Sequence, residues 1–422
     1  MRQYRLSIVL AAICIAVLSC TGAKPDKQIL FNSSDTSDVP YRIPALGAFS
    51  DGTLIAISDY RPCMADIGYG KVDLHIRLSL DNGHTWSEEA VLLEGSGIGG
   101  AVDCGFGDAA IVCDCESDEV LVITVCGNTV YYAKTTTRQN PNRMAVLRSH
   151  DKGKTWEPWK EITEDVYSLF DESSNGPVQS CFATSGKIFQ SRIIKKGDYY
   201  RIYVALCARP HGNRVIFSDD FGRTWKPLSG ADAFPVPNGD EAKCAELPDG
   251  SIILSSRAYE GRYFNIFTYS SPNGIAEGEG TWGHGAFSGK DNKGCYTQDN
   301  ACNGELLIVP AERVSDGQRV NLALQSIPIG PQRKNVSIYY KEVPDASDPT
   351  EGWTSEDMAS GWQDLFVAST VTSAYSTMVM QKDGLIGFLL EESLNSSNNG
   401  YNIVYQTFTI LQITNGKYRY SK

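Results

Sequence analysis

Histidine is scarce in this sequence: the 422-residue chain has five, and they are scattered. No H-E-x-x-H motif occurs, so the pattern typical of zinc hydrolases is missing. Basic residues are also in deficit, with 38 Lys and Arg against 50 Asp and Glu and a formal net charge of −12. Proteins that bind nucleic acid or anionic membranes usually carry the opposite excess. We therefore expect no nucleic-acid partner, and an anionic ligand would need cations gathered locally.

Long apolar runs are absent except at the N-terminus, where residues 1–20 join a basic start to the apolar stretch 6–18. This stretch is too short to span a bilayer and is typical of a signal peptide. Its end resembles the lipobox of bacterial lipoproteins, which predicts lipidation of Cys20; ordinary cleavage after Ala23 is the alternative. We expect an exported protein, in the periplasm or at the outer membrane or cell surface, that touches a membrane only through Cys20. Residues 21–40 are expected to form a short linker.

Metal and cofactor motifs are also missing. Ten cysteines follow Cys20 and could pair in an oxidising compartment, but their spacing does not determine the pairing. Cys113 and Cys115 have no second Cys or His pair at zinc-site spacing. The G-x-G-x-x-G match at 95–100 is followed by a strand-like segment rather than a helix, unlike a dinucleotide site. We expect neither a metal nor a cofactor.

The sequence does contain a clear repeat. The pattern S-x-D-x-G-x-T-W occurs at 79–86, 149–156 and 218–225, and the starts lie 70 and 69 residues apart. A weaker copy with an insertion runs over 271–282. A near-constant period of this size marks a repeated supersecondary unit.

Turn and strand signals indicate what the unit is made of. Asp-Gly pairs between apolar runs predict β-hairpins, and they occur at 51–52, 249–250 and 383–384. No segment sustains a capped amphipathic helix pattern. A period near 70 is typical of the four-stranded blades of a β-propeller, and the 402 residues after Cys20 would make six units of 67. We predict an all-β, six-bladed β-propeller over residues 41–422.

The Tyr-Arg-Ile-Pro motif at 41–44, together with the three repeats, resembles the bacterial sialidase (neuraminidase) family with Asp-box repeats. The resemblance extends from about residue 41 to residue 391. It implies a propeller with a central pocket that hydrolyses terminal α-linked sialic acid. The implied partners are sialylated glycans or glycoconjugates, and we expect a monomer.

Sialic acid carries a carboxylate on its anomeric carbon, so its site requires converging guanidinium groups that can form bidentate hydrogen bonds. By resemblance, the substrate-binding arginines are Arg42, Arg257 and Arg319. Arg313 is an alternative to Arg319, because the local pattern there is loose. Arg61 resembles an additional arginine that contacts the substrate.

A carboxylate nucleophile would be repelled by the substrate's own carboxylate, whereas a tyrosine can attack as a neutral phenol that loses its proton to a base. Tyr375 occupies the position of the family's nucleophile. Glu241 resembles the glutamate that activates this tyrosine, with Asp240 and Glu246 as alternatives. The phenol needs such a base because its ordinary pKa is about 10.

The leaving oxygen needs an acid, which later acts as the base that activates water. Asp66, in a segment expected to be a loop, resembles the family's acid, and Asp59 and Asp73 are alternatives on flanking strands. Two supporting positions follow from the resemblance. Glu391 would orient Arg42, and Asp108 would contact substrate, although Asp108 precedes alanine where the family often has proline.

We therefore expect a retaining exo-α-sialidase that forms a glycosyl intermediate on Tyr375. A trans-sialidase or an intramolecular trans-sialidase would use the same residues and differ in what attacks the intermediate. A sialic-acid-binding lectin would need the arginines but not Tyr375, Glu241 and Asp66 together.

Overall fold

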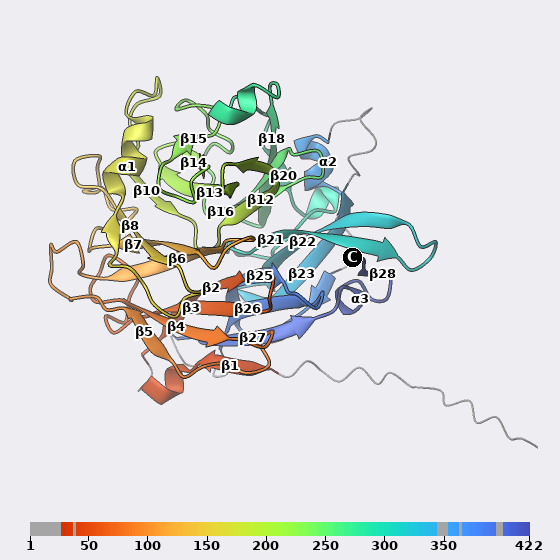
Figure 1. Cartoon of the computed structure of the whole chain (residues 1–422), viewed down its shortest axis with the longest axis horizontal. Helices are drawn as coiled ribbons and strands as arrows, with labels where there is room; N and C mark the ends of the chain where they lie inside the picture. The colour runs from red at the N-terminus through yellow and green to blue at the C-terminus, as the bar shows by residue number, and fades with distance from the viewer. Residues whose placement is uncertain (1–26, 37–38, 344–352, 363–364, 394–399) are drawn as a thin grey trace, which may run out of the picture.

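The computed structural model describes residues 27–36, 39–343, 353–362, 365–393 and 400–422. The expected signal peptide and its Cys20 lie outside these residues. Six sheets, antiparallel except for the parallel pairing of β11 with β6, stand around a central axis, and Figure 1 shows strands β2, β6, β16, β21 and β25 near the middle. The predicted six-bladed, all-β propeller is confirmed.

The blades follow one another along the chain. Blade one contains β2 (Tyr41–Ala48), β3 (Leu54–Tyr60), β4 (Asp73–Ser79) and β5 (Ala90–Leu93). Blade two contains β6 (Phe106–Cys113), β7 (Val120–Cys126), β8 (Arg143–Ser149), β9 (Lys160–Glu161) and β11 (Gly186–Lys187). Blade three contains β10 (Ser180–Ala183), β12 (Phe189–Lys196), β13 (Tyr199–Arg209), β14 (Gly212–Ser218) and β15 (Lys226–Pro227).

The second half of the chain repeats this order. Blade four contains β16 (Ala242–Glu246), β17 (Ile252–Ala258), β18 (Gly261–Tyr269), β19 (Gly280–Trp282) and β20 (Ala286–Ser288). Blade five contains β21 (Leu306–Arg313), β22 (Arg319–Gly330), β23 (Lys334–Val343), β24 (Leu365–Val367) and β28 (Tyr418–Tyr420). Blade six contains β25 (Ser373–Met380), β26 (Ile386–Glu392), β27 (Asn402–Phe408) and β1 (Gln28–Phe31). The α-helices are short: α1 (Thr163–Tyr167), α2 (Ser355–Ala359) and α3 (Ile410–Ile413).

Blade six closes the ring with both ends of the chain. Strand β1 pairs antiparallel with β27, with Gln28 opposite Tyr405 and Ile29 opposite Val404, and the two strands lie side by side in Figure 1. The expected linker over 21–40 is therefore wrong in part, because the propeller begins before Tyr41. The four residues of β1 are too few to give a strand signal of their own in the sequence.

The three repeats form the same turn at the same place, after the third strand of blades one, two and three. In each turn the Asp carboxylate accepts hydrogen bonds from the Thr backbone N–H at 2.8 Å and from the Thr hydroxyl at 2.6–2.7 Å. The Ser hydroxyl accepts the Gly N–H at 2.7–2.8 Å. These bonds satisfy the backbone inside the turn without help from the sheet.

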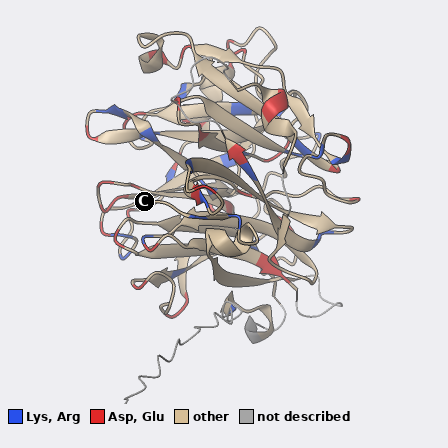
Figure 2. Cartoon of the chain, turned by 90° about the vertical axis from the view of Figure 1, so that its right-hand side faces the viewer, with Lys and Arg blue, Asp and Glu red and all other residues tan. Residues whose placement is uncertain are grey.

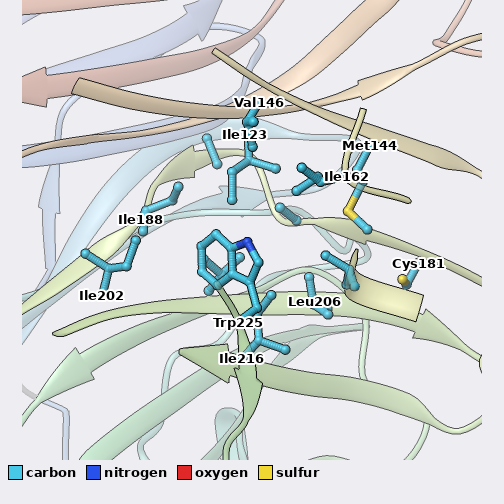
Figure 3. Packing of buried hydrophobic residues seen from close by; sticks show 14 of the residues in the cluster. Ile123, Met144, Val146, Ile162, Cys181, Ile188, Ile202, Leu206, Ile216 and Trp225 are labelled. Atoms are coloured by element: carbon cyan, nitrogen blue, oxygen red, sulfur yellow. The ribbon is translucent and has the colours of Figure 1, made fainter. Parts of the chain in front are cut away.

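Each repeat also joins its blade to the preceding one. The three glycines have positive φ of 79–81° and sit so close to the preceding blade that a Cβ would collide with it. Trp86 packs edge-on against Tyr405 of blade six, with ring centroids 5.1 Å apart. Trp225 packs among residues of blades two and three (Figure 3). The repeats therefore act as connectors between blades.

The hydrophobic core consists of several clusters between neighbouring blades rather than of one central cluster. Ile123, Met144 and Val146 of blade two meet Ile202 and Ile216 of blade three in the largest cluster (Figure 3). Acidic and basic residues are interspersed over strands and loops (Figure 2). In the described part of the chain, no helix is long and apolar enough to cross a membrane.

Candidate active site

A cavity of about 500 Å³ lies at one end of the innermost strands, near the axis. Seven of the predicted site residues line it: Arg42, Arg61, Asp66, Asp108, Glu241, Arg257 and Tyr375. They come from blades one, two, four and six and are brought together only by closure of the ring. Glu391 lies behind the wall, and Arg319 lies elsewhere.

Three innermost strands are interrupted by a bulge at this cavity. The register shifts between Arg42 and Ala45 in β2, between Gly107 and Ala110 in β6, and between Ser373 and Ser376 in β25. A bulge bends a strand locally and re-aims its side chains. The bulges therefore direct the side chains of Arg42, Asp108 and Tyr375 into the cavity. In a regular strand, successive side chains would instead alternate between the two faces of the sheet.

Tyr375 and Glu241 form a buried pair at the bottom of the cavity. The phenol oxygen of Tyr375 donates to Glu241 Oε2 at 2.7 Å, and Arg257 Nη1 lies 2.6 Å from that oxygen and 3.1 Å from the phenol oxygen. Burial raises the pKa of Tyr375 well above its usual value, and the Glu241 carboxylate adds to the shift; Arg257 opposes it. The phenol of Tyr375 is therefore held in its neutral form beside the Glu241 carboxylate.

The rival carboxylates stand further from the phenol. Asp240 lines the cavity and has Oδ2 at 3.4 Å from Arg257 Nε. Glu246 lies at the other end of β16, where it accepts hydrogen bonds from the Ser191 hydroxyl and the Arg192 N–H. Of the three candidates, Glu241 alone is hydrogen-bonded to Tyr375.

Glu391 is fully buried and ties two bulges together. Its Oε1 accepts from Arg42 Nε at 2.7 Å and from the Ile43 N–H at 2.8 Å, and its Oε2 accepts from the Tyr375 N–H at 3.1 Å. One carboxylate thus fixes both the Arg42 side chain and the backbone that carries Tyr375.

Arg61 collects three carboxylates on the opposite wall. Its guanidinium lies 2.8 Å from Asp59, 2.9 Å from Asp66 and 3.7 Å from Asp108. Burial raises the pKa of Asp59 to about 6, although Arg61 acts in the other direction. Burial and the neighbouring Asp59 and Asp66 carboxylates raise the pKa of Asp108 well above its usual range. Asp66 is the exposed member, with 53% of its side chain accessible.

The two alternatives to Asp66 are both buried strand residues. Asp59 lies under Arg61 and accepts the backbone N–H of Asp108 at 3.0 Å. Asp73 accepts the Gly95 N–H at 2.7 Å and does not line the cavity. Only Asp66 combines a loop position with access to the cavity.

The prediction for the third arginine is corrected by the structure. Arg319 is exposed at the start of β22, and its rival Arg313 is paired with Glu342 at 2.5 Å. Arg333, in the turn after β22, lines the cavity with its guanidinium carbon 5.6 Å from the Tyr375 ring centroid. Arg319 and Arg333 therefore lie at opposite ends of one hairpin strand. The sequence signal available for Arg333 was the turn at Pro331 and Gln332, which places it at a hairpin tip.

Arg333 differs from the other arginines of the cavity in its pairing. Arg42 is paired with Glu391, Arg257 with Glu241 and Arg61 with Asp59. Among the described residues, no carboxylate lies within 4.0 Å of the Arg333 guanidinium. It is therefore available to an anionic ligand.

The cavity also has an uncharged side. Phe182, Tyr131 and Ile67 pack together in one cluster there, and the Tyr131 hydroxyl lies 3.1 Å from Cys207 Sγ. The exposed rings of Tyr69 and Tyr132 stand at the rim, with hydroxyls 3.0 Å apart. In the described residues all ten cysteines are free, so none of the possible disulfides forms.

The fold is a six-bladed β-propeller, and its axial cavity holds a buried phenol paired with a carboxylate together with several guanidinium groups. No family model matches the chain. A sialidase of Paraclostridium sordellii is 27% identical over 338 residues, which is 78% of each chain. A sialidase of Micromonospora viridifaciens is 32% identical over 224 residues, 51% of this chain but 32% of that protein.

Solved structures show the same fold. The Hadza microbial sialidase Hz136 has a TM-score of 0.69 at 22% identity, over 92% of this chain and 69% of that one. A leech intramolecular trans-sialidase has a TM-score of 0.69 at 17% identity, over 94% and 72%. The chain is therefore similar in sequence and in fold to bacterial sialidases, which are glycoside hydrolases.

Proposed function

We propose that the protein is an exo-α-sialidase that removes terminal α-linked sialic acid from glycoconjugates with retention of configuration. The observation that carries the proposal is the 2.7 Å hydrogen bond between the Tyr375 phenol and Glu241 inside a cavity lined by Arg42, Arg257 and Arg333. A binding protein would gain nothing from a buried phenol paired with a base.

Binding begins with the carboxylate of the substrate. Arg333 has no carboxylate partner in the described residues, so it can form charge-assisted hydrogen bonds to that group at once. Arg42 is held by Glu391 through Nε, which leaves Nη1 to face the ligand. Arg257 stands between the ligand and the Tyr375–Glu241 pair. The three guanidinium groups would fix the anomeric carbon above the phenol oxygen.

In the first step, the Tyr375 oxygen attacks the anomeric carbon while its proton passes to Glu241. The bond from that carbon to the leaving oxygen breaks, and Asp66 supplies the proton that this oxygen needs. Arg257, 3.1 Å from the phenol oxygen, stabilises the charge that develops there as the proton leaves. The product is a covalent glycosyl–tyrosine.

In the second step, Asp66 takes a proton from water, and the water oxygen attacks the anomeric carbon. The bond to Tyr375 breaks, and the phenol oxygen recovers its proton from Glu241. Two inversions at one carbon give net retention. The exposed Asp66, held by Arg61 at 2.9 Å, lies on a loop that substrate can move into place.

Export and anchoring belong to the same proposal. Residues 1–20 have the composition of a signal peptide, and Cys20 ends a lipobox-like segment. We propose a monomeric lipoprotein on the periplasmic or outer surface. Labelling with a radioactive fatty acid tests this: a Cys20→Ser variant should lose the label, and an equally labelled variant would refute the anchor.

The catalytic proposal is tested with residues 21–422, which contain every described residue. Release of sialic acid from a fluorogenic α-sialoside should occur with the parent and fall by at least about 1,000-fold in Tyr375→Phe. The matched control is Tyr340→Phe, because the buried Tyr340 hydroxyl has no hydrogen-bond partner in the described residues. Full activity in folded Tyr375→Phe would refute the nucleophile.

Product analysis separates the alternatives. Free sialic acid released first as the α-anomer, which is the retained configuration, supports the hydrolase. Transfer to added lactose identifies a trans-sialidase, and an anhydro-sugar identifies an intramolecular one. Binding without any product would support a lectin and refute the enzyme.

A further inference from the structure

A second cavity, of about 380 Å³, lies at the opposite end of the innermost strands. Strand β2 contributes Arg42 to the catalytic cavity and residues 46–49 to this one. Strand β25 likewise contributes Tyr375 to the first and Val379 and Met380 to the second. The two cavities therefore open at opposite ends of the propeller axis, and the second has no part in the proposed hydrolysis.

The charges in this second cavity are of one sign. Lys187, Arg192 and Lys382 line it, and none of the residues that line it is acidic, although the chain has a net charge of −12. Within the described residues, no carboxylate lies within 4.0 Å of any of these three cations. The deeper Glu305 is 3.8 Å from Lys243 instead. The cavity thus gathers three cations without a carboxylate partner among the described residues; Lys382 Nζ donates to the backbone carbonyl of Asp51 at 3.3 Å.

Two acidic residues beside the wall, Asp114 and Glu246, are hydrogen-bonded to residues that line the cavity. Asp114 accepts a hydrogen bond from Gln190 Nε2 at 2.7 Å. Glu246 accepts from the Ser191 hydroxyl at 2.5 Å and from the Arg192 N–H at 2.9 Å. Neither residue lines the cavity, although Glu246 still interacts electrostatically with Arg192.

The rest of the wall is largely apolar. It is formed by side chains from four blades and by Ile188, which lies between blades two and three: Leu46, Phe49, Ile111, Ile188, Leu307, Val379 and Met380. A simple inorganic anion would pair with the cations but would leave the apolar surface exposed to water. A ligand with an anionic head and an apolar tail would satisfy both parts of the cavity.

We propose that this cavity is a binding site for a monomeric amphiphile, with a carboxylate head held by Lys187, Arg192 and Lys382 and an alkyl tail against the apolar wall. The site is independent of sialic acid chemistry. Its Lys382 and Arg192 side chains are exposed, so they can be replaced without opening the core.

Octanoate is the probe, and calorimetry with residues 21–422 gives its affinity. Lys382→Gln and Arg192→Gln each remove one charge-assisted contact, so each should weaken the binding of octanoate by about tenfold. Lys154→Gln is the control, because this exposed lysine lies in a repeat turn and changes the net charge equally. Acetate and octanol should each bind at least about tenfold more weakly than octanoate, since each lacks one half of the ligand.

A second readout reports the location. Cys115 lines the cavity and is the exposed cysteine among the ten that the structure describes. Partial burial of its sulfur and the neighbouring Asp114 carboxylate raise the pKa of its thiol to about 11. Alkylation of this thiol by maleimide is therefore slow enough to follow. Octanoate should slow this alkylation, and the protection should be lost in Lys382→Gln.

Several results would overturn the proposal. No measurable octanoate binding would do so, as would equal binding in the Lys154, Lys382 and Arg192 variants. Octanol as tight as octanoate would show an apolar cleft without an anion site, and acetate as tight as octanoate would show a simple ion site. Sialidase activity should be unchanged in Lys382→Gln, and its loss would contradict the separation of the two cavities.

Discussion

At the scale of single residues, the pairing of each arginine decides its role. Arg42, Arg61 and Arg257 are held by carboxylates and are therefore preset in position, whereas Arg333 has no such partner among the described residues. Sequence reasoning found the first three because each lies close to a recognisable motif. It chose Arg319, with Arg313 as the alternative, and missed Arg333 because nothing in the sequence tells which end of a hairpin faces the axis.

Replacing Arg333 should therefore matter and replacing Arg319 should not. Arg333→Gln removes a charge-assisted contact to the substrate carboxylate and should lower kcat/KM by at least about tenfold. Arg319→Gln, at an exposed position outside the cavity, should change kcat/KM by less than about twofold. Steady-state kinetics on a fluorogenic sialoside measures both, and the opposite ranking would restore the original assignment.

Glu391 is predicted to be a positioning residue. Glu391→Gln keeps the shape but gives up the charge that pairs with Arg42 at 2.7 Å, so kcat/KM should fall by about tenfold, mainly through KM. Glu391→Asp should lower kcat/KM less than Glu391→Gln does, because it keeps the negative charge on a side chain that is one methylene shorter. If Glu391→Gln lowered kcat with KM intact, a direct part in the chemistry would replace the positioning role.

At the scale of elements, the repeats and the bulges do different work. The repeats are visible in the sequence because their bonds are local, within eight residues of one turn. The bulges at Arg42, Asp108 and Tyr375 are invisible there, since they depend on register against a neighbouring strand. The fold class could thus be predicted, while the inward aim of the site residues came only from the structure.

The energetic contribution of the contact between a repeat and the preceding blade can be measured by comparing substitutions at two glycines. Gly222 and Gly230 have similar φ of 79° and 82°, but a Cβ at Gly222 would lie 2.5 Å from Leu121 of blade two, whereas Gly230 has open space. Gly230→Ala should cost about 1–2 kcal/mol for its positive φ alone. Gly222→Ala should cost clearly more in denaturant unfolding, and equal costs would show that the blades adjust freely.

The turn carboxylates predict a dependence on pH. Hydrogen bonds from Thr155 lower the pKa of Asp151 from its usual value to about 2. A carboxyl group whose pKa is depressed by folding stabilises the protein above its unfolded pKa, and this contribution disappears as pH falls toward the folded value. The Tm deficit of Asp151→Asn should therefore shrink between pH 5 and pH 3.

The matched control for that experiment is Asp198→Asn, in the exposed hairpin between β12 and β13. Its Tm should follow the parent at every pH. A deficit in Asp151→Asn that stayed constant from pH 5 to pH 3 would mean that the charge of this carboxylate does not support the turn.

At the scale of the whole molecule, closure of blade six by β1 holds the ring together. Deleting residues up to 32 should lower the Tm by several degrees relative to deletion up to 26, because it leaves the edge of β27 unpaired. Thermal unfolding measures the difference, and light scattering should show association through the bared edge. Equal Tm values would mean that β1 adds nothing to the closed ring. This strand could not be predicted from the sequence, because its partner lies more than 370 residues away.

That same closure sets an order on synthesis. Apart from β28 in blade five, the strands of blades one to five lie close together along the chain, so these blades can largely assemble as they emerge. Gln28 is synthesised near the start of the chain, but its partner Tyr405 is synthesised near the end, so the two strands can pair only late. An unfinished chain therefore has five blades and no closed ring, and since the cavity draws Arg42 from blade one and Tyr375 from blade six, catalysis becomes possible only when the final blade is in place.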